Sequence, residues 1–169
     1  SNKMTYLGDG IYSLTFRNLA AATYEYKVAI NGSWNENYGA NGAGNGGNIK
    51  LVVPYAQDVT IYYSDVTHFA VDTINYIFAD ITLSGKNVPE GTKLADEGLT
   101  GIYNVTVKLP AGTYTDLKLE YNGVTYTFSK FTLAKEKEVT FCMDPLSGLF
   151  YHDGSATKVK ASALYFDSK

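Results

Sequence analysis

The amino-acid sequence predicts an all-β protein built from two tandem immunoglobulin-like antiparallel β-sandwich modules. Apolar and polar residues alternate over short segments, which is the side-chain periodicity of a strand with one buried face. Gly, Asn, Asp and Pro separate these segments at intervals of roughly ten residues, whereas helical periodicity is nearly absent. Short strands with regularly spaced turn residues are typical of antiparallel sandwiches.

The expected strands follow from this alternation, taken in chain order. In the segment 24–30, both tyrosines fall on one face of the strand, whereas Glu25 and Lys27 fall on the other. Asn31-Gly32 and Asn122-Gly123 predict two-residue hairpin turns, because Asn and Gly accept positive φ. The expected strands are Ile11–Phe16, Tyr24–Ile30, Ile49–Val53, Val59–Tyr63, Ile77–Leu83, Tyr103–Leu109, Asp116–Tyr121, Thr125–Phe128 and Glu138–Met143.

An internal repeat predicts the domain organisation. Residues 10–32 recur as 101–123: each copy begins with Gly-Ile-Tyr, continues through a strand and a Thr-Tyr pair, and ends with a Lys and an Asn-Gly turn. We therefore expect two related modules, residues 1–76 and 77–157, with a boundary near residues 75–80.

Composition excludes several classes of function. The chain has 14 basic and 17 acidic residues, a net charge of -3, which gives no electrostatic attraction to nucleic acid. No apolar run reaches the roughly 20 residues of a membrane helix, so we expect no membrane partner. The single Cys142 predicts a packed thiol and no internal disulfide. His68 and His152 lack metal-ligand spacing, and we expect no cofactor or metal.

The two copies differ where a functional site is expected. Only the first copy has the segment 33–38 and a following loop, 39–47, with five Gly and two Asn. Trp34, the only tryptophan, lies among polar residues there, and two interpretations are open: a core residue, or a surface on which a pyranose ring stacks. Lys27 is either a solvated strand residue or a sugar ligand on the same side as Trp34. The loop is either mobile or places Asn48 beside Trp34.

Catalysis by this chain is not expected. Glycoside hydrolysis needs two carboxylates at a controlled separation, and the acidic residues are scattered among the expected strand ends. Glu36, beside Trp34, has no evident carboxylate partner. For His68 we favour a structural role at a strand edge over a sugar hydrogen bond.

Residues 23–39, 46–49 and 67–69, taken together, resemble the starch-binding X25-type module of bacterial amylopullulanases. The resemblance covers roughly residues 3–75 and extends to the family 48 carbohydrate-binding modules, including the glycogen-binding domain of the AMP-activated kinase β subunit. In those modules a Lys, a Trp and an Asn form an α-glucan cradle. Lys27, Trp34 and Asn48 occupy the matching positions, and we add Tyr38 and Asn37 as expected carbohydrate contacts.

The match has one departure. Those families carry a further tryptophan on an earlier strand, which this chain lacks. Either that strand lies upstream of this sequence, or a tyrosine such as Tyr38 takes its place. Residues 80–155 look like the companion sandwich that follows the X25 module in clostridial-type amylopullulanases, and residues 158–169 like the start of a following module or linker.

The resemblance implies a non-catalytic module that binds α-glucan, namely starch, amylopectin, glycogen or maltooligosaccharides, and directs an attached enzyme or scaffold to it. The alternative is a structural spacer that positions an attached amylolytic enzyme or cohesin and binds nothing. The implied partners are the polysaccharide and covalently attached neighbouring modules, and we expect a monomer. The implied location is extracellular or at a bacterial cell surface, within a larger multimodular protein.

Overall fold

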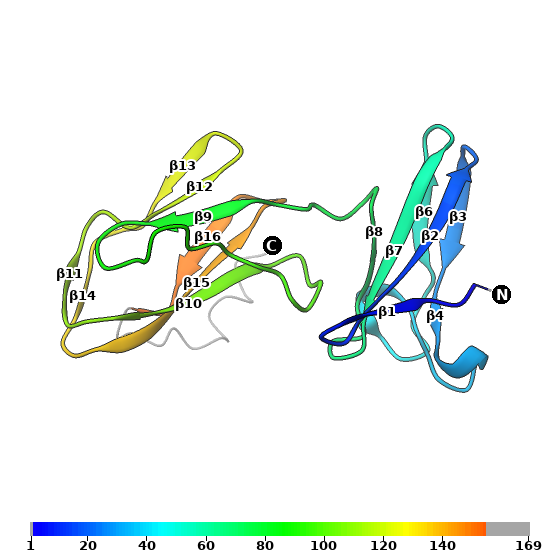
Figure 1. Cartoon of the computed structure of the whole chain (residues 1–169), viewed down its shortest axis with the longest axis horizontal. Coiled ribbons are helices and arrows are strands. Elements are labelled where there is room, and N and C mark those ends of the chain that lie inside the picture. Colours follow the sequence, from blue (N-terminus) through cyan, green and yellow to red (C-terminus); the bar gives the residue numbers. More distant parts are fainter. Residues whose placement is uncertain (1, 155–169) are drawn as a thin grey trace, which may run out of the picture. The chain divides into compact units, whose positions relative to one another are not determined.

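The computed structural model describes residues 2–154 and confirms the predicted fold class, two all-β sandwich modules in tandem (Figure 1). Contacts divide the chain into two units. The first comprises Ser1–Phe78 together with Asp96–Gly101, and the second comprises Ala79–Ala95 and the residues from Ile102 onward. Nothing in the sequence indicates that the six residues Asp96–Gly101 belong to the first unit. The boundary between residues 76 and 77 stays a prediction, and the segment 158–169 lies outside the described residues.

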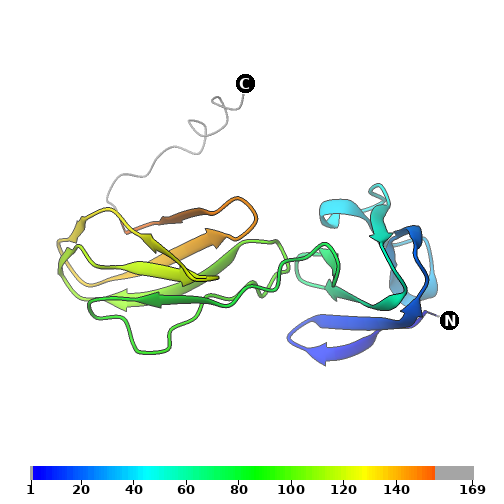
Figure 2. The same cartoon turned by 90° about the horizontal axis from the view of Figure 1, so that it is seen from above.

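The first unit is a sandwich of short antiparallel strands. One layer is a four-stranded sheet in the order β1-β2-β7-β8, and its edge hairpin β1–β2 forms one margin of the unit (Figure 2). The pairs β3–β6 and β4–β5 lie opposite. The bounds are β1 Thr5–Gly8, β2 Ile11–Leu19, β3 Ala22–Tyr26, β4 Val28–Ala29, β5 Asn37–Tyr38, β6 Ile49–Val53, β7 Gln57–Ser64 and β8 Ala70–Asp72.

The core of the first unit lies between the two layers. Alternate residues of β6 and β7 are buried, and Leu51, Val53 and Val59 form a cluster against which Tyr24 and Tyr26 of β3 pack. The chain has 15 tyrosines, and two of them thus contribute to this core. Because β3 and β6 contribute to the core through one face, their other face is left for the site described below.

A buried carboxylate joins β8 to the opposite layer. Asp72 is only 1% exposed and accepts hydrogen bonds from the Tyr26 hydroxyl (3.0 Å) and from the Ile74 and Asn75 backbone N–H groups (3.0 and 2.8 Å). The Asn75 amide, which donates to Asp72 (3.0 Å), is also 3.4 Å from the Lys50 carbonyl. Burial, followed by the Asp72 charge, raises the pKa of Tyr26 far above its usual value, so Tyr26 remains a hydrogen-bond donor.

The second unit is also a two-layered sandwich. One sheet has the order β10-β15-β16 and the other the order β13-β12-β9, and β11 pairs with β14 at one end (Figure 1). The bounds are β9 Ile81–Ser84, β10 Tyr103–Leu109, β11 Gly112–Tyr114, β12 Lys118–Tyr121, β13 Val124–Thr127, β14 Phe131–Leu133, β15 Lys137–Asp144 and β16 Leu149–His152.

Aromatic rings fill the core of the second unit around His152. The His152 imidazole lies 4.3 Å from the Phe131 ring centre and 5.4 Å from that of Phe128. Its Nδ1 accepts a hydrogen bond from the Gly154 N–H (2.9 Å). Burial lowers the pKa of His152, and Lys137 lowers it further, whereas Asp153 opposes the shift. The neutral imidazole is therefore the form that suits the folded state.

We expect the second unit to lose stability as the pH falls below about 6.5, the ordinary pKa of histidine. Below that value the unfolded chain takes up a proton that the folded chain resists, so unfolding becomes more favourable until the lower, folded-state pKa of His152 is passed. Hydrogen exchange of the β15 amides, measured between pH 7.5 and 5.5, checks this. His152→Gln should flatten the pH dependence, and an unchanged slope in that variant would contradict the assignment.

The internal repeat is visible in the strand register. Thr15 of β2 pairs with Thr60 of β7, and Thr106 of β10 pairs with Thr140 of β15. In each pair the two hydroxyls are hydrogen bonded at 2.8 Å. The paired residues are 45 positions apart in the first copy and 34 in the second, so the first copy is longer by 45 − 34 = 11 residues. This difference reflects the additional segment around Trp34 and the glycine-rich loop.

The structure corrects several expected elements. The strand expected at Tyr24–Ile30 is interrupted at Lys27 and ends at Ala29, and the strand expected at Ile77–Leu83 begins only at Ile81. The short strands β1, β5, β8, β11, β14 and β16 were not expected, because two to four residues carry too little alternation to be recognised. The expected strands Ile49–Val53 and Tyr103–Leu109 match β6 and β10.

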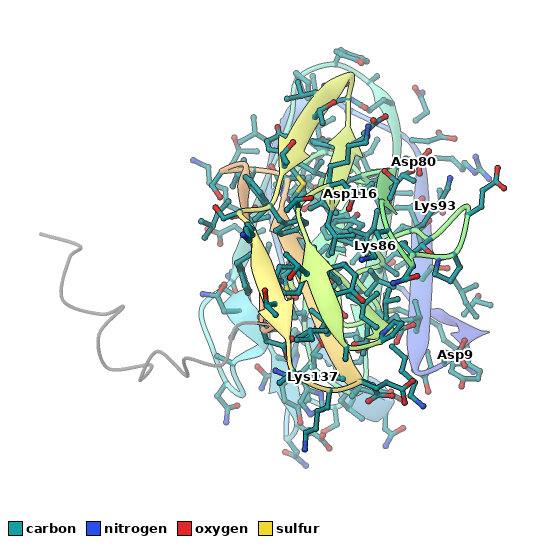
Figure 3. All side chains as sticks on the ribbon, turned by 90° about the vertical axis from the view of Figure 1, so that its left-hand side faces the viewer. Asp9, Asp80, Lys86, Lys93, Asp116 and Lys137 are labelled. Carbon is teal, nitrogen blue, oxygen red and sulfur yellow. The ribbon has the colours of Figure 1, made fainter. Side chains whose placement is uncertain are left out.

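Exposed ion pairs of the second unit include Lys93–Asp80 (2.8 Å; Figure 3) and Lys108–Glu136 (2.8 Å). Such exposed ion pairs contribute about 0–1 kcal/mol each, so the core dominates stability. Within residues 2–154, no helix is long and apolar enough to cross a membrane, and no group of three metal-ligating side chains was found.

Candidate functional site

The candidate site is built on the connection between β4 and β5, at the lower end of the first unit in Figure 1. Asn31 (φ 52°) and Gly32 (φ 68°) form the expected left-handed turn, closed by a hydrogen bond from the Ser33 N–H to the Ile30 carbonyl (3.0 Å). This turn is the 3₁₀ element η1 (Ile30–Gly32). The expected two-residue hairpin is nevertheless wrong, because pairing resumes only where Ala29 meets Asn37.

The connection between β4 and β5 in the first copy is longer than the corresponding connection between β12 and β13 in the second copy. In the second copy, Tyr121 pairs directly with Val124 across Asn122-Gly123, which is a two-residue hairpin as predicted. In the first copy, residues 33–36 continue outward before β5 begins. Trp34 belongs to this extra segment and therefore has no structural counterpart in the second unit.

Trp34 lies at the surface and outside the core. Its side chain is 69% exposed, so the core interpretation is wrong. A flat indole beside polar groups is suited to a partner with its own apolar face. The Trp34 backbone is fixed, because its carbonyl accepts a hydrogen bond from the Asn37 side chain (2.9 Å).

The side chains of Lys27 and Asn37 contact each other next to the Trp34 turn. The Lys27 ammonium is half-buried and lies 3.5 Å from the Asn37 amide oxygen. An ammonium group has three hydrogens, so Lys27 keeps donors for a bound ligand after this contact. Asn37 is 7% exposed, and its two amide hydrogens are taken by the Trp34 carbonyl and by the Asn45 side-chain oxygen (2.8 Å). Its side chain is thus engaged within the protein.

Asn48 reaches the same face from β6. The pairing of β3 with β6 ends with Tyr26 opposite Ile49. The next residues, Lys27 and Asn48, therefore lie next to each other just beyond the paired part of the two strands. The Asn48 amide is exposed and donates to the Glu25 carboxylate (2.9 Å). Glu25 and Lys27 lie two positions apart and share the outward face. The face therefore presents an ammonium, an amide and a carboxylate.

Tyr38 lies apart from this group. Because Asn37 and Tyr38 are consecutive in β5, their side chains point to opposite faces. The Tyr38 ring stacks on the His68 imidazole, with ring centres 3.9 Å apart and planes at 2°, and its hydroxyl donates to Glu36 (2.8 Å). That hydrogen bond raises the pKa of Tyr38. His68 also bonds the Tyr63 hydroxyl (2.8 Å), in agreement with the structural role we favoured.

The glycine-rich loop is held by backbone hydrogen bonds. The Ala40 N–H donates to the Gly47 carbonyl (2.9 Å), which closes the base of the loop, and the 3₁₀ element η2 (Ala40–Gly42) forms its first turn. At Gly39, a β-carbon would collide with the Gly47 carbonyl oxygen, so this position accepts only glycine. Asn45 connects the loop to β5, because its N–H donates to the Asn37 carbonyl (2.9 Å).

The sequence of the first unit matches a known domain family. Residues 1–70 match the pullulanase X25 domain. The matched residues include the Trp34 turn, the glycine-rich loop and Lys27. Among curated proteins, the chain is 43% identical over 60 residues to an amylopullulanase of Thermoanaerobacterium thermosulfurigenes. The aligned residues are 36% of this chain and 3% of that protein.

Two further amylopullulanases show the same local similarity. The protein of Thermoanaerobacterium saccharolyticum is 43% identical over 60 residues, and that of Thermoanaerobacter thermohydrosulfuricus is 43% identical over 63 residues, or 36% and 37% of this chain. The matched segments cover 5% and 4% of those proteins. The matched segment thus spans only a small part of the length of these relatives.

Two contacts of the X25 site escaped sequence reasoning. Glu25 accepts a hydrogen bond from Asn48, but the sequence predicted it only as an outward-facing strand residue. Its position two residues before Lys27 puts both side chains on the same face. Asn45 accepts a hydrogen bond from the Asn37 amide, but the sequence indicated it only as one of the two asparagines of the loop. The sole signal for Asn45 was its tolerance of positive φ (54°), which it shares with Asn41 (58°).

Proposed function

We propose that the first unit is a non-catalytic carbohydrate-binding module that binds α-glucan, with Trp34 as its central contact. The observation that carries this proposal is the exposed Trp34 indole, on a turn held by Asn37, whose side chain also contacts Lys27. An exposed indole on a turn fixed by hydrogen bonds offers a preformed flat surface for a ligand.

The chemistry of the face suits a pyranose ring. The C–H face of a glucose unit stacks on the indole, and the ring hydroxyls meet the Lys27 ammonium and the Asn48 amide. These groups come from the connection between β3 and β4, the following turn and the residue before β6. Stacking prefers the curved face of a helical α-1,4 chain, so we expect starch, amylopectin, glycogen or maltooligosaccharides to bind ahead of flat cellulose.

A single site of this kind binds weakly. One stacked ring and a few exposed hydrogen bonds give a Kd in the micromolar to millimolar range, or roughly -8 to -4 kcal/mol. The small share of the amylopullulanase relatives that this chain covers supports a role within a multimodular protein, outside the cell or on a bacterial cell surface. Neighbouring modules would then supply avidity, and the X25 domain would bring an attached enzyme or scaffold to starch.

For the second unit we propose a spacer role. Its Asn122-Gly123 hairpin leads directly into β13, so this unit has no turn that corresponds to the one carrying Trp34. The lysine equivalent to Lys27 is Lys118, whose ammonium is 3.3 Å from the Glu120 carboxylate. This unit therefore lacks the indole and has its lysine paired, which fits a module that positions its neighbours.

Affinity electrophoresis tests the proposal. The whole chain is run in native gels with and without amylopectin, beside a protein that does not bind starch. We expect the chain to be retarded by amylopectin and released by maltoheptaose. Migration equal to that of the reference protein at all amylopectin concentrations would favour the alternative, in which the whole chain is a structural spacer.

A further inference from the structure

The glycine-rich loop is joined to the Trp34 turn through a pair of asparagines. Asn37 and Asn45 are doubly connected: the Asn45 N–H donates to the Asn37 carbonyl (2.9 Å), and the Asn37 amide donates to the Asn45 side-chain oxygen (2.8 Å). The second hydrogen of the Asn37 amide is donated to the Trp34 carbonyl (2.9 Å). Loop, strand and turn are thus linked through one buried amide.

This arrangement leaves Asn37 unsuited to direct sugar contact. A side-chain amide has two hydrogens, and both are used inside the protein. The side chain is nearly buried, and its oxygen faces the Lys27 ammonium. Our expectation from the sequence, that Asn37 is a sugar ligand, is therefore better replaced by a positioning role.

We propose that Asn45 and Asn37 form a latch by which the glycine-rich loop holds Trp34 and Lys27 in position for the glucan. This inference rests on the proposed function. The hydrogen-bonded pair fixes the Asn37 amide, which in turn fixes the carbonyl of the tryptophan and the direction of the ammonium. The loop is then a rigid support for the site, which explains why loop and tryptophan occur together in one copy and are both absent from the other.

The sequence offers a matched pair of variants to test the latch. Asn45 and Asn41 are both exposed, lie in the same loop and have nearly the same left-handed backbone (φ 54° and 58°). Alanine at either position carries the same backbone strain. Only Asn45→Ala removes the acceptor of the Asn37 amide. Asn45→Asp keeps that acceptor and tolerates the same backbone, so it serves as the rescue variant.

Two readouts follow from the single tryptophan. Because Trp34 is the only tryptophan of the chain, the anisotropy of its fluorescence reports the turn directly. We expect Asn45→Ala to lower the anisotropy and to raise the Kd for maltoheptaose roughly two- to tenfold, the loss expected for one hydrogen bond. Asn41→Ala and Asn45→Asp should stay near wild type in both measurements.

The outcomes separate this inference from the proposed function. Equal anisotropy and equal Kd in Asn45→Ala and Asn41→Ala would overturn the latch, as would a loss of anisotropy without a loss of affinity. Absence of maltoheptaose binding by the wild-type chain would overturn the proposed function, and the latch as a support for glucan binding with it. The anisotropy of the variants would in that case still show whether the asparagine pair holds the turn.

Discussion

Replacing Trp34 by alanine is expected to abolish the retardation of the chain in amylopectin gels. The indole supplies the stacking surface of the proposed site, and central aromatic contacts of this kind contribute about 2 kcal/mol or more. The Kd for maltoheptaose should therefore rise at least roughly 30-fold. Because the side chain is 69% exposed and lies outside the core, the free energy of unfolding should change little.

Tyr55 provides the matched control. It is another exposed aromatic residue of the first unit, 65% exposed in the turn between β6 and β7. Tyr55→Ala removes a comparable ring, away from Lys27 and Asn48, and should leave the retardation unchanged. Wild-type retardation of Trp34→Ala, or equal losses in both variants, would show that glucan binding does not depend on this indole.

The largest loss of stability is expected from Asp72→Ala. The carboxylate accepts hydrogen bonds from Tyr26, Ile74 and Asn75, and its removal leaves these donors without their acceptor in the interior. Removing one partner of a buried charged network costs about 3–5 kcal/mol. We expect the first unit to unfold at a much lower urea concentration, with faster hydrogen exchange of the β7 amides.

Asp65→Ala is the corresponding control in the same unit. Asp65 is exposed, so its replacement should shift the urea midpoint only slightly. The exchange rates of β10 and β15 in the second unit should stay close to wild type in both variants. A midpoint for Asp72→Ala that equals that of Asp65→Ala would contradict the role of the buried carboxylate as the connection between the two layers.

Regular features of the fold could be predicted from sequence because they repeat over several residues. The alternation of buried residues in β6 and β10 spans five and seven positions, and both strands lie where the pattern places them. Asn122-Gly123 forms its hairpin because the flanking strands pair at once. Asn31-Gly32 has the same turn conformation, yet the pairing resumes later, because the polar segment 33–36 has no strand periodicity.

The remaining features depend on contacts between residues that are distant in sequence. Asp72 looks like an ordinary strand-end carboxylate until Tyr26, 46 positions away, is placed beside it. Asn37 looks like a surface residue next to Trp34 until Asn45 covers it. The segment Asp96–Gly101 reads as part of the second module, but it belongs to the first unit by its contacts. No local pattern encodes these pairings.

Because the chain has one tryptophan, its single indole N–H signal in a proton–nitrogen NMR spectrum tests the account most directly. The uniformly labelled chain is titrated with maltoheptaose and, separately, with cellohexaose. We predict that maltoheptaose shifts the indole signal in a saturable manner, with a Kd in the micromolar to millimolar range, and that cellohexaose leaves it unmoved. An indole signal that stays in place at millimolar maltoheptaose would contradict the assignment of Trp34 as the glucan contact.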